Sequence, residues 1–158
     1  MDRLHRFAKS FINFHFPDFN LRVRQSRENS ADYEKNIIRL NLRDTEDYGF
    51  MRHLHEVHGF KISDTLISPM MWTILHEVGH FATIDEIPPQ DYDEAISTKM
   101  LLTLYGEEIK TDPTLQDKYF NTITEWEATE WAIKWVKTHF DEAYHATKTM
   151  QRLTVSRG

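Results

Sequence analysis

The spacing of hydrophobic residues predicts a short sheet near the start of a chain that is otherwise helical. Residues 3–14 carry large apolar side chains at nearly helical spacing, and Phe16-Pro17 ends this pattern. Further helical patterns occupy residues 45–57, 68–83, 91–105, 115–138 and 140–153. The predicted fold class is therefore α+β, a short β-sheet or hairpin followed by a mostly helical bundle.

Two segments, 21–24 and 38–43, alternate apolar and polar side chains in the way that half-buried strands do. The polar stretch 26–35 separates them, and a polar link between two strands predicts a β-hairpin.

Length and composition indicate one domain, residues 1–158, that is large enough to bury a core. The chain has no apolar run of 18 residues, so no membrane span is expected. Its first residues lack the unbroken apolar centre of a signal peptide. It has no cysteine, which excludes disulfides and thiolate metal ligands. Together these features favour a cytoplasmic protein without membrane partners.

Charge is distributed unevenly along the chain. The net charge is −6, yet residues 1–43 contain nine Lys and Arg against five Asp and Glu. The remainder contains ten against twenty. Overall acidity argues against general nucleic-acid binding. The basic segment could face an acidic partner or nucleic acid, but arginines on the solvent face of a sheet are the simpler expectation.

Residues 76–80 read His-Glu-Val-Gly-His, an H-E-x-x-H motif. Residues four apart lie on one face of a helix, so both imidazoles could reach one metal ion. Glu77 would project beside that ion and could hold and deprotonate a bound water. Because the chain has nine histidines, a chance match to the motif has a probability of roughly 4%. The sequence around the motif must therefore decide.

The residues before the motif favour a helix. Ser68 can cap its start, and Pro69 suits the first helical position because no amide donor is needed there. Gly79 lowers helix propensity by about 1 kcal/mol relative to Ala. A glycine inside a buried helix often marks the close approach of another backbone, which a compact metal site would use.

A catalytic zinc ion normally has three protein ligands. The segment 123–136 is a strongly apolar helix with three glutamates, of which Glu127 and Glu130 are expected to face solvent. Glu125 differs, because it shares a side of the helix with small residues at Ala128, Thr129 and Ala132. These would let the two helices approach closely and bring Glu125 to the metal.

This pair of motifs resembles the gluzincin type of zincin metallopeptidases, and most of all the compact ImmA/IrrE family of prophages and stress regulators. That family's second motif, E-x-x-A-[N/D]-x-[F/W]-A, stands here as residues 125–132, with Thr129 at the position that is usually Asn or Asp and commonly supports a ligand. The resemblance implies a small zincin-like domain. It also implies Zn²⁺ held by His76, His80 and Glu125, with Glu77 as general base.

In zincins, an edge strand beside the motif helix pairs with an extended peptide. Residues 36–43 are the expected edge strand, where Arg39 and Arg43 would protect the edge or contact a substrate.

Other histidines and a tyrosine extend the set of candidate residues. His53, His55 and His58 form a cluster in which His55 and His58 are only three residues apart rather than four, so a second metal site is a weaker alternative. Related enzymes often place an oxyanion-stabilising donor after the third ligand. His139, Tyr144 and His145 are the candidates here, and a purely structural role for each stays open.

The sequence therefore predicts a small zinc metallopeptidase, most simply a metalloendopeptidase, that acts on a protein or peptide. Zn²⁺ would polarise the scissile carbonyl and acidify its water, while Glu77 moves the proton to the leaving amine. By analogy with the family, a regulatory protein is the first substrate to test, and the chain itself could be a phage or prophage regulator. Two alternatives stay open: a zinc-binding regulatory protein with a degenerate site, and a metal-free helical interaction domain.

Overall fold

The computed structural model describes residues 1–43 and 49–155 and has the predicted α+β class, with helices predominating. Its α-helices are α1 (Arg3–His15), α2 (Phe50–Glu56), α3 (Pro69–Thr83), α4 (Pro89–Thr103), α5 (Pro113–Phe120), α6 (Ile123–Thr138) and α7 (Phe140–Val155). Its strands are β1 (Arg22–Gln25), β2 (Ser30–Asp32) and β3 (Ile37–Leu40). Short 3-10 helices cover Pro17–Phe19, Ile84–Glu86 and Gly106–Lys110. No described helix combines the length and apolar character needed to cross a membrane.

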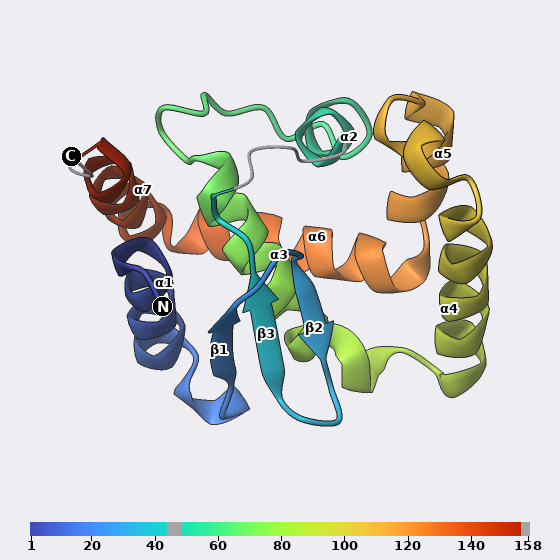
Figure 1. Ribbon diagram of the computed structural model, residues 1–158, viewed down its shortest axis with the longest axis horizontal. Coiled ribbons are helices and arrows are strands. Elements are labelled where there is room, and N and C mark those ends of the chain that lie inside the picture. The colour runs from blue at the N-terminus through green and yellow to red at the C-terminus, as the bar shows by residue number, and fades with distance from the viewer. Residues whose placement is uncertain (44–48, 156–158) are drawn as a thin grey trace.

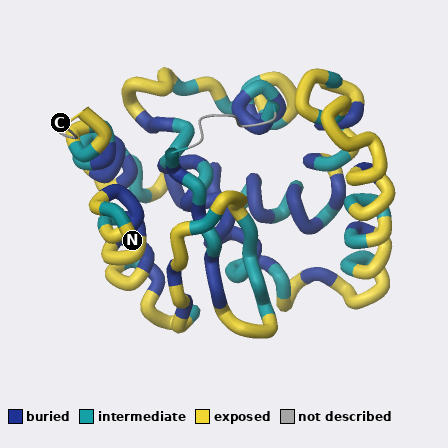
Figure 2. The backbone as a smooth tube through the Cα atoms, viewed as in Figure 1, coloured by how far each residue is buried: buried dark blue, intermediate teal, exposed yellow. Residues whose placement is uncertain are grey.

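Two crossing helices, α3 and α6, form the centre of the molecule and pack on each other more extensively than any other pair of elements (Figure 1). The sheet lies against α3, with α1 and α7 together at one end of the molecule and α4 and α5 at the other. Buried residues concentrate on α3, α6 and β3, whereas one side of α4 is exposed along its length (Figure 2).

The sheet differs from the predicted hairpin. Its order is β1-β3-β2, with β1 parallel to β3 and β2 antiparallel to β3. The hairpin joins β2 to β3 through a turn in which Asn36 adopts a positive φ of 53°, which Asn tolerates well. The polar stretch 26–35 therefore contains a strand, because pairing uses the backbone and needs no apolar alternation.

The prediction of 36–43 as the edge strand is also wrong, because β3 is the central strand. Ile37, Ile38 and Leu40 are at most 2% exposed, as expected for a strand covered on both faces. β1 and β2 are the edges of the described sheet. Arg39 lies 3.5 Å from Asp32 and Arg43 lies 3.0 Å from Asp2, so both arginines are paired within the molecule.

The expected helix at 115–138 consists of two helices, α5 and α6. Thr122 has extended backbone with ψ of 147° and donates its hydroxyl hydrogen bond to the carbonyl of Tyr119 at 2.7 Å. Asn121 Oδ1 lies 2.9 Å from His53 Nε2 at the same break. The break between α5 and α6 thus coincides with a contact to α2. Local helix propensity did not reveal this break. The expected helix at 45–57 begins at Phe50, with 44–48 outside the described residues.

Candidate metal centre

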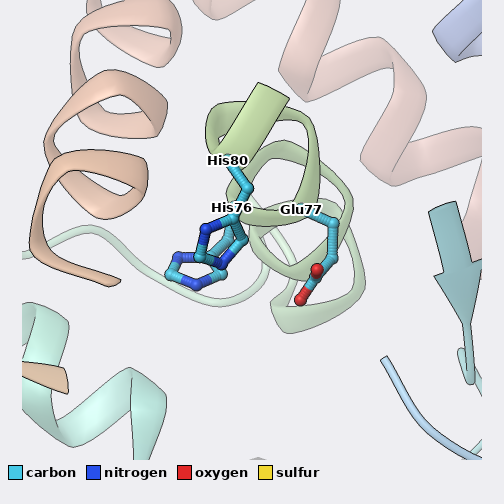
Figure 3. Close-up of side chains that lie close together, drawn as sticks. All are labelled: His76, Glu77 and His80. Atoms are coloured by element: carbon cyan, nitrogen blue, oxygen red, sulfur yellow. The ribbon is translucent and has the colours of Figure 1, made fainter. Parts of the chain in front are cut away.

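The motif helix α3 begins as its sequence predicts. The Ser68 side chain accepts a hydrogen bond from the Met71 amide at 3.2 Å, and Pro69 occupies the first turn. The helix continues through His76 and His80, which lie one turn apart. Their ring centroids are 4.8 Å apart (Figure 3). The local sequence therefore places both imidazoles on one side of α3.

Glu77 lies beside the two histidines (Figure 3). His76, Glu77 and His80 each offer a donor atom within 4.8 Å of the other two, and all three residues are at most 7% exposed. Among the described residues, no other three His, Asp or Glu side chains are grouped by this distance criterion. The histidines could hold a metal ion with Glu77 adjacent to it.

Glu125 reaches both histidines from α6. Its Oε1 lies 3.4 Å from His76 Nε2, and its Oε2 lies 2.9 Å from His80 Nε2. Ligands about 2.0–2.1 Å from a tetrahedral Zn²⁺ ion are about 3.3 Å from one another. The distances from Glu125 to the two histidines are close to this spacing, so Glu125 could share a metal ion with them. Glu125 suits the third ligand better than Glu77, because its oxygens directly face both Nε2 atoms.

A close helix crossing explains how Glu125 reaches the motif. A Cβ atom added to Gly79 would lie 2.5 Å from the backbone carbonyl oxygen of Ala128, so only glycine fits without a shift. Ala128 and Ala132 on the facing side of α6 are fully buried. The expectation of close backbone approach at Gly79 is confirmed. Glu125 lies about one helical turn before this crossing.

Thr129 links Glu125 to His76. Its hydroxyl donates to the backbone carbonyl of Glu125 at 2.9 Å and also lies 3.1 Å from His76 Nδ1. Because the single hydroxyl proton is used in the first bond, His76 Nδ1–H must donate in the second. With the proton on Nδ1 held in this way, loss of the Nε2 proton to which Glu125 is close would leave the Nε2 lone pair for a metal. His80 Nδ1, by contrast, has no hydrogen-bond partner among the described residues.

The two carboxylates of the site have pKa values shifted in opposite directions. Burial raises the pKa of Glu77 to about 7, with Glu125 adding to the rise and His76 and Lys99 opposing it. Burial also acts to raise the pKa of Glu125, but the charges and hydrogen bonds of His80 and His76 outweigh it and hold that pKa well below its usual range. The two environments therefore separate the pKa values of two neighbouring carboxyl groups, a pattern found in many active sites.

Three side chains around the site were not identified from the sequence. Lys99 Nζ lies 3.2 Å from Glu125 Oε2. The Tyr33 ring, in the turn after β2, lies 6.5 Å from the His80 ring. Glu125 and then burial raise the pKa of Tyr119 well above its usual range, so its hydroxyl stays protonated. The sequence could have drawn attention to Lys99, because it is the only charged residue in 95–106.

The three suggested oxyanion donors do not reach the site. His139 is 14 residues beyond Glu125, which corresponds to roughly 21 Å along α6. It stacks on Trp135 at 4.5 Å, whereas Tyr144 stacks on Phe140 at 6.2 Å. His145 lines a groove between α1 and α7 with Phe7, Phe11 and Phe14 among its neighbours. The direction of α6 carries these residues away from the candidate metal centre.

The second histidine cluster contacts other side chains. His53 Nε2 lies 2.9 Å from Asn121 Oδ1, and His58 Nδ1 lies 2.7 Å from Glu130 Oε1. His55 joins no three-ligand group in the part of the chain that the structure describes. Glu130 is partly exposed and Glu125 is 4% exposed, so the expected difference between these glutamates is confirmed. Glu127 is partly exposed as well.

Comparisons with protein-family models, with curated proteins and with solved structures found no match to this chain. The geometry of the site therefore carries the functional argument.

Proposed function

We propose that this protein is a small zinc-dependent metallopeptidase of gluzincin type. The observation that carries the proposal is the contact of Glu125 with both Nε2 atoms, at 3.4 Å from His76 and 2.9 Å from His80. Two imidazoles and a carboxylate are a known ligand set of catalytic zinc, and they leave a fourth position for water or substrate. The resemblance of the two sequence motifs to ImmA/IrrE peptidases supports the same conclusion.

His76, His80 and Glu125 would hold Zn²⁺, which when bound supplies a Lewis acid for the scissile carbonyl. Thr129 holds His76 in the tautomer whose Nε2 faces the site. Glu77 takes a proton from the attacking water and delivers it to the leaving amine. Burial, which acts to raise the pKa of Glu77, suits a carboxyl group that accepts a proton and then returns it.

The edge strand β2 is the proposed place for an extended peptide. It packs against α3 and pairs with β3 on one side only within the described sheet. Tyr33, directly after β2, lies against His80 and Phe81. A peptide that adds to β2 would therefore run beside the motif helix.

A second candidate function is a zinc-binding regulatory protein with a degenerate peptidase site. The burial of the site favours it, because His76, Glu77, His80 and Glu125 are each at most 7% exposed. In this case zinc would stabilise the crossing of α3 and α6, and partner contact would carry the function.

Metal analysis of protein purified without added zinc tests the site, and peptide cleavage separates the two functions. We expect about one zinc ion per chain in the native protein and in Glu77→Gln, with a large loss in Glu125→Ala. Glu77→Gln should abolish cleavage of a peptide library that the native protein hydrolyses. Glu127→Ala, at a partly exposed position on the same helix, is the matched control and should keep both zinc and cleavage. A metal-free native protein would sink the proposal, whereas zinc without cleavage would favour the regulatory function.

A further inference from the structure

Lys99 is a charged side chain in direct contact with one of the proposed ligands, Glu125. Its side chain is 17% exposed, whereas those of His76, His80 and Glu125 are 7%, 8% and 5% exposed. It extends from α4 to place Nζ 3.2 Å from Glu125 Oε2, and it lies 5.8 Å from the centre of the Tyr119 ring. Its flexible four-carbon stem connects this buried contact to the protein surface.

The contact uses a carboxylate oxygen that faces the histidines. Glu125 Oε2 lies 2.9 Å from His80 Nε2 as well as 3.2 Å from Lys99 Nζ, and the other oxygen, Oε1, faces His76. A lysine bound to an oxygen turned away from the histidines would leave the other oxygen free for a metal ion. Neither oxygen of Glu125 is free in this way.

A metal ion and the ammonium group would therefore lie close together. An ion about 2.1 Å from Oε2 could be at most about 5.3 Å from Nζ. Like charges at this range repel, and a largely buried site screens the repulsion poorly. We propose that Lys99 competes with the metal ion for Glu125 and thereby sets the metal affinity of the site. This inference rests on the proposed metal site and adds the residue that controls its occupancy.

The first test compares zinc affinities of Lys99→Met, Lys118→Met and the native protein by competition with a chromophoric chelator. Lys118 is an exposed lysine on α5, so its replacement changes the net charge equally without touching the site. We expect Lys99→Met to bind zinc at least about tenfold more tightly, the scale on which residues behind the ligands alter metal affinity. Lys118→Met should match the native protein. Equal or weaker zinc binding by Lys99→Met would overturn the inference.

The second test uses the native chain and so does not depend on a variant that folds. Amine acylation followed by mass spectrometry measures the reactivity of Lys99 with and without one equivalent of zinc, with Lys118 as internal reference. Displacement of the ammonium predicts faster acylation of Lys99 when zinc is added. Unchanged or slower acylation relative to Lys118 would contradict competition.

The two tests also separate this inference from the proposed function. If neither the native protein nor Lys99→Met binds zinc, both proposals fail. If both bind zinc equally, the metal site stands and the role of Lys99 falls. If only Lys99→Met binds zinc, competition is supported and the native chain is no zinc peptidase.

Discussion

Replacing Gly79 with alanine tests whether the crossing of α3 and α6 builds the metal site. The added Cβ would lie 2.5 Å from the carbonyl oxygen of Ala128, and contacts under 3.0 Å essentially never occur. The helices must therefore separate by at least about 0.5 Å, because the obstacle is backbone rather than a flexible side chain. Zinc–ligand distances tolerate only about ±0.2 Å. The separation should thus disturb Glu125 on one helix relative to the histidines on the other.

The expected stability change follows from two opposing effects. Alanine gains about 1 kcal/mol of helix propensity over glycine. Overpacking of a tightly packed interface costs typically 1–3 kcal/mol. We expect urea unfolding of the metal-free protein to show a net loss of about 0–2 kcal/mol, with zinc affinity about tenfold lower. Ala82→Gly, on the same helix, is the control for propensity and should lose about 1 kcal/mol. If Gly79→Ala were about 1 kcal/mol more stable than the native protein and bound zinc normally, the proposed steric role of the crossing would be refuted.

Two further predictions concern particular hydrogen bonds. Thr129→Val keeps the side-chain shape but removes the hydroxyl that links Glu125 to His76 Nδ1, so zinc affinity should fall about 10- to 100-fold. Thr129→Ser keeps the hydroxyl and should retain the native zinc affinity. Chelator competition measures both affinities, and equal affinities of the Val and Ser variants would exclude the link. Burial raises the pKa of Asp2, but hydrogen bonds from His5 and Arg43 outweigh this effect and hold the pKa well below its usual range. The stabilisation by ionised Asp2 is complete above its unfolded pKa of about 3.9 and disappears as pH falls through the folded value. Asp2→Asn keeps a good helix cap and removes only the charge. Its unfolding free energy, measured by urea denaturation across pH, should lie below that of the native protein at neutral pH and approach it in acid. Parallel pH curves for the two proteins would contradict this assignment.

Local sequence determined the parts of the site that depend on neighbouring residues. Ser68 and Pro69 begin α3, and a spacing of four residues places His76 and His80 together, because helix geometry repeats wherever a helix forms. The small residues after Glu125 and the glycine at position 79 likewise indicated two helices in close contact. These features follow from periodicity and residue size, which are visible in a single segment.

Only the tertiary structure decided which distant groups meet. The sheet order depends on backbone pairing, so β3 lies between β1 and β2 although 26–35 shows no strand pattern. Lys99 reaches Glu125 because α4 packs on α6, and although Lys99 stands out as the one charged residue of 95–106, the sequence does not specify its partner. Thr129 likewise acts through its position opposite His76. The sequence by itself thus predicted two candidate ligands, a candidate base and a candidate third ligand. The residues around this candidate site are brought together by long-range packing. The distance between them along the chain does not predict which of them meet.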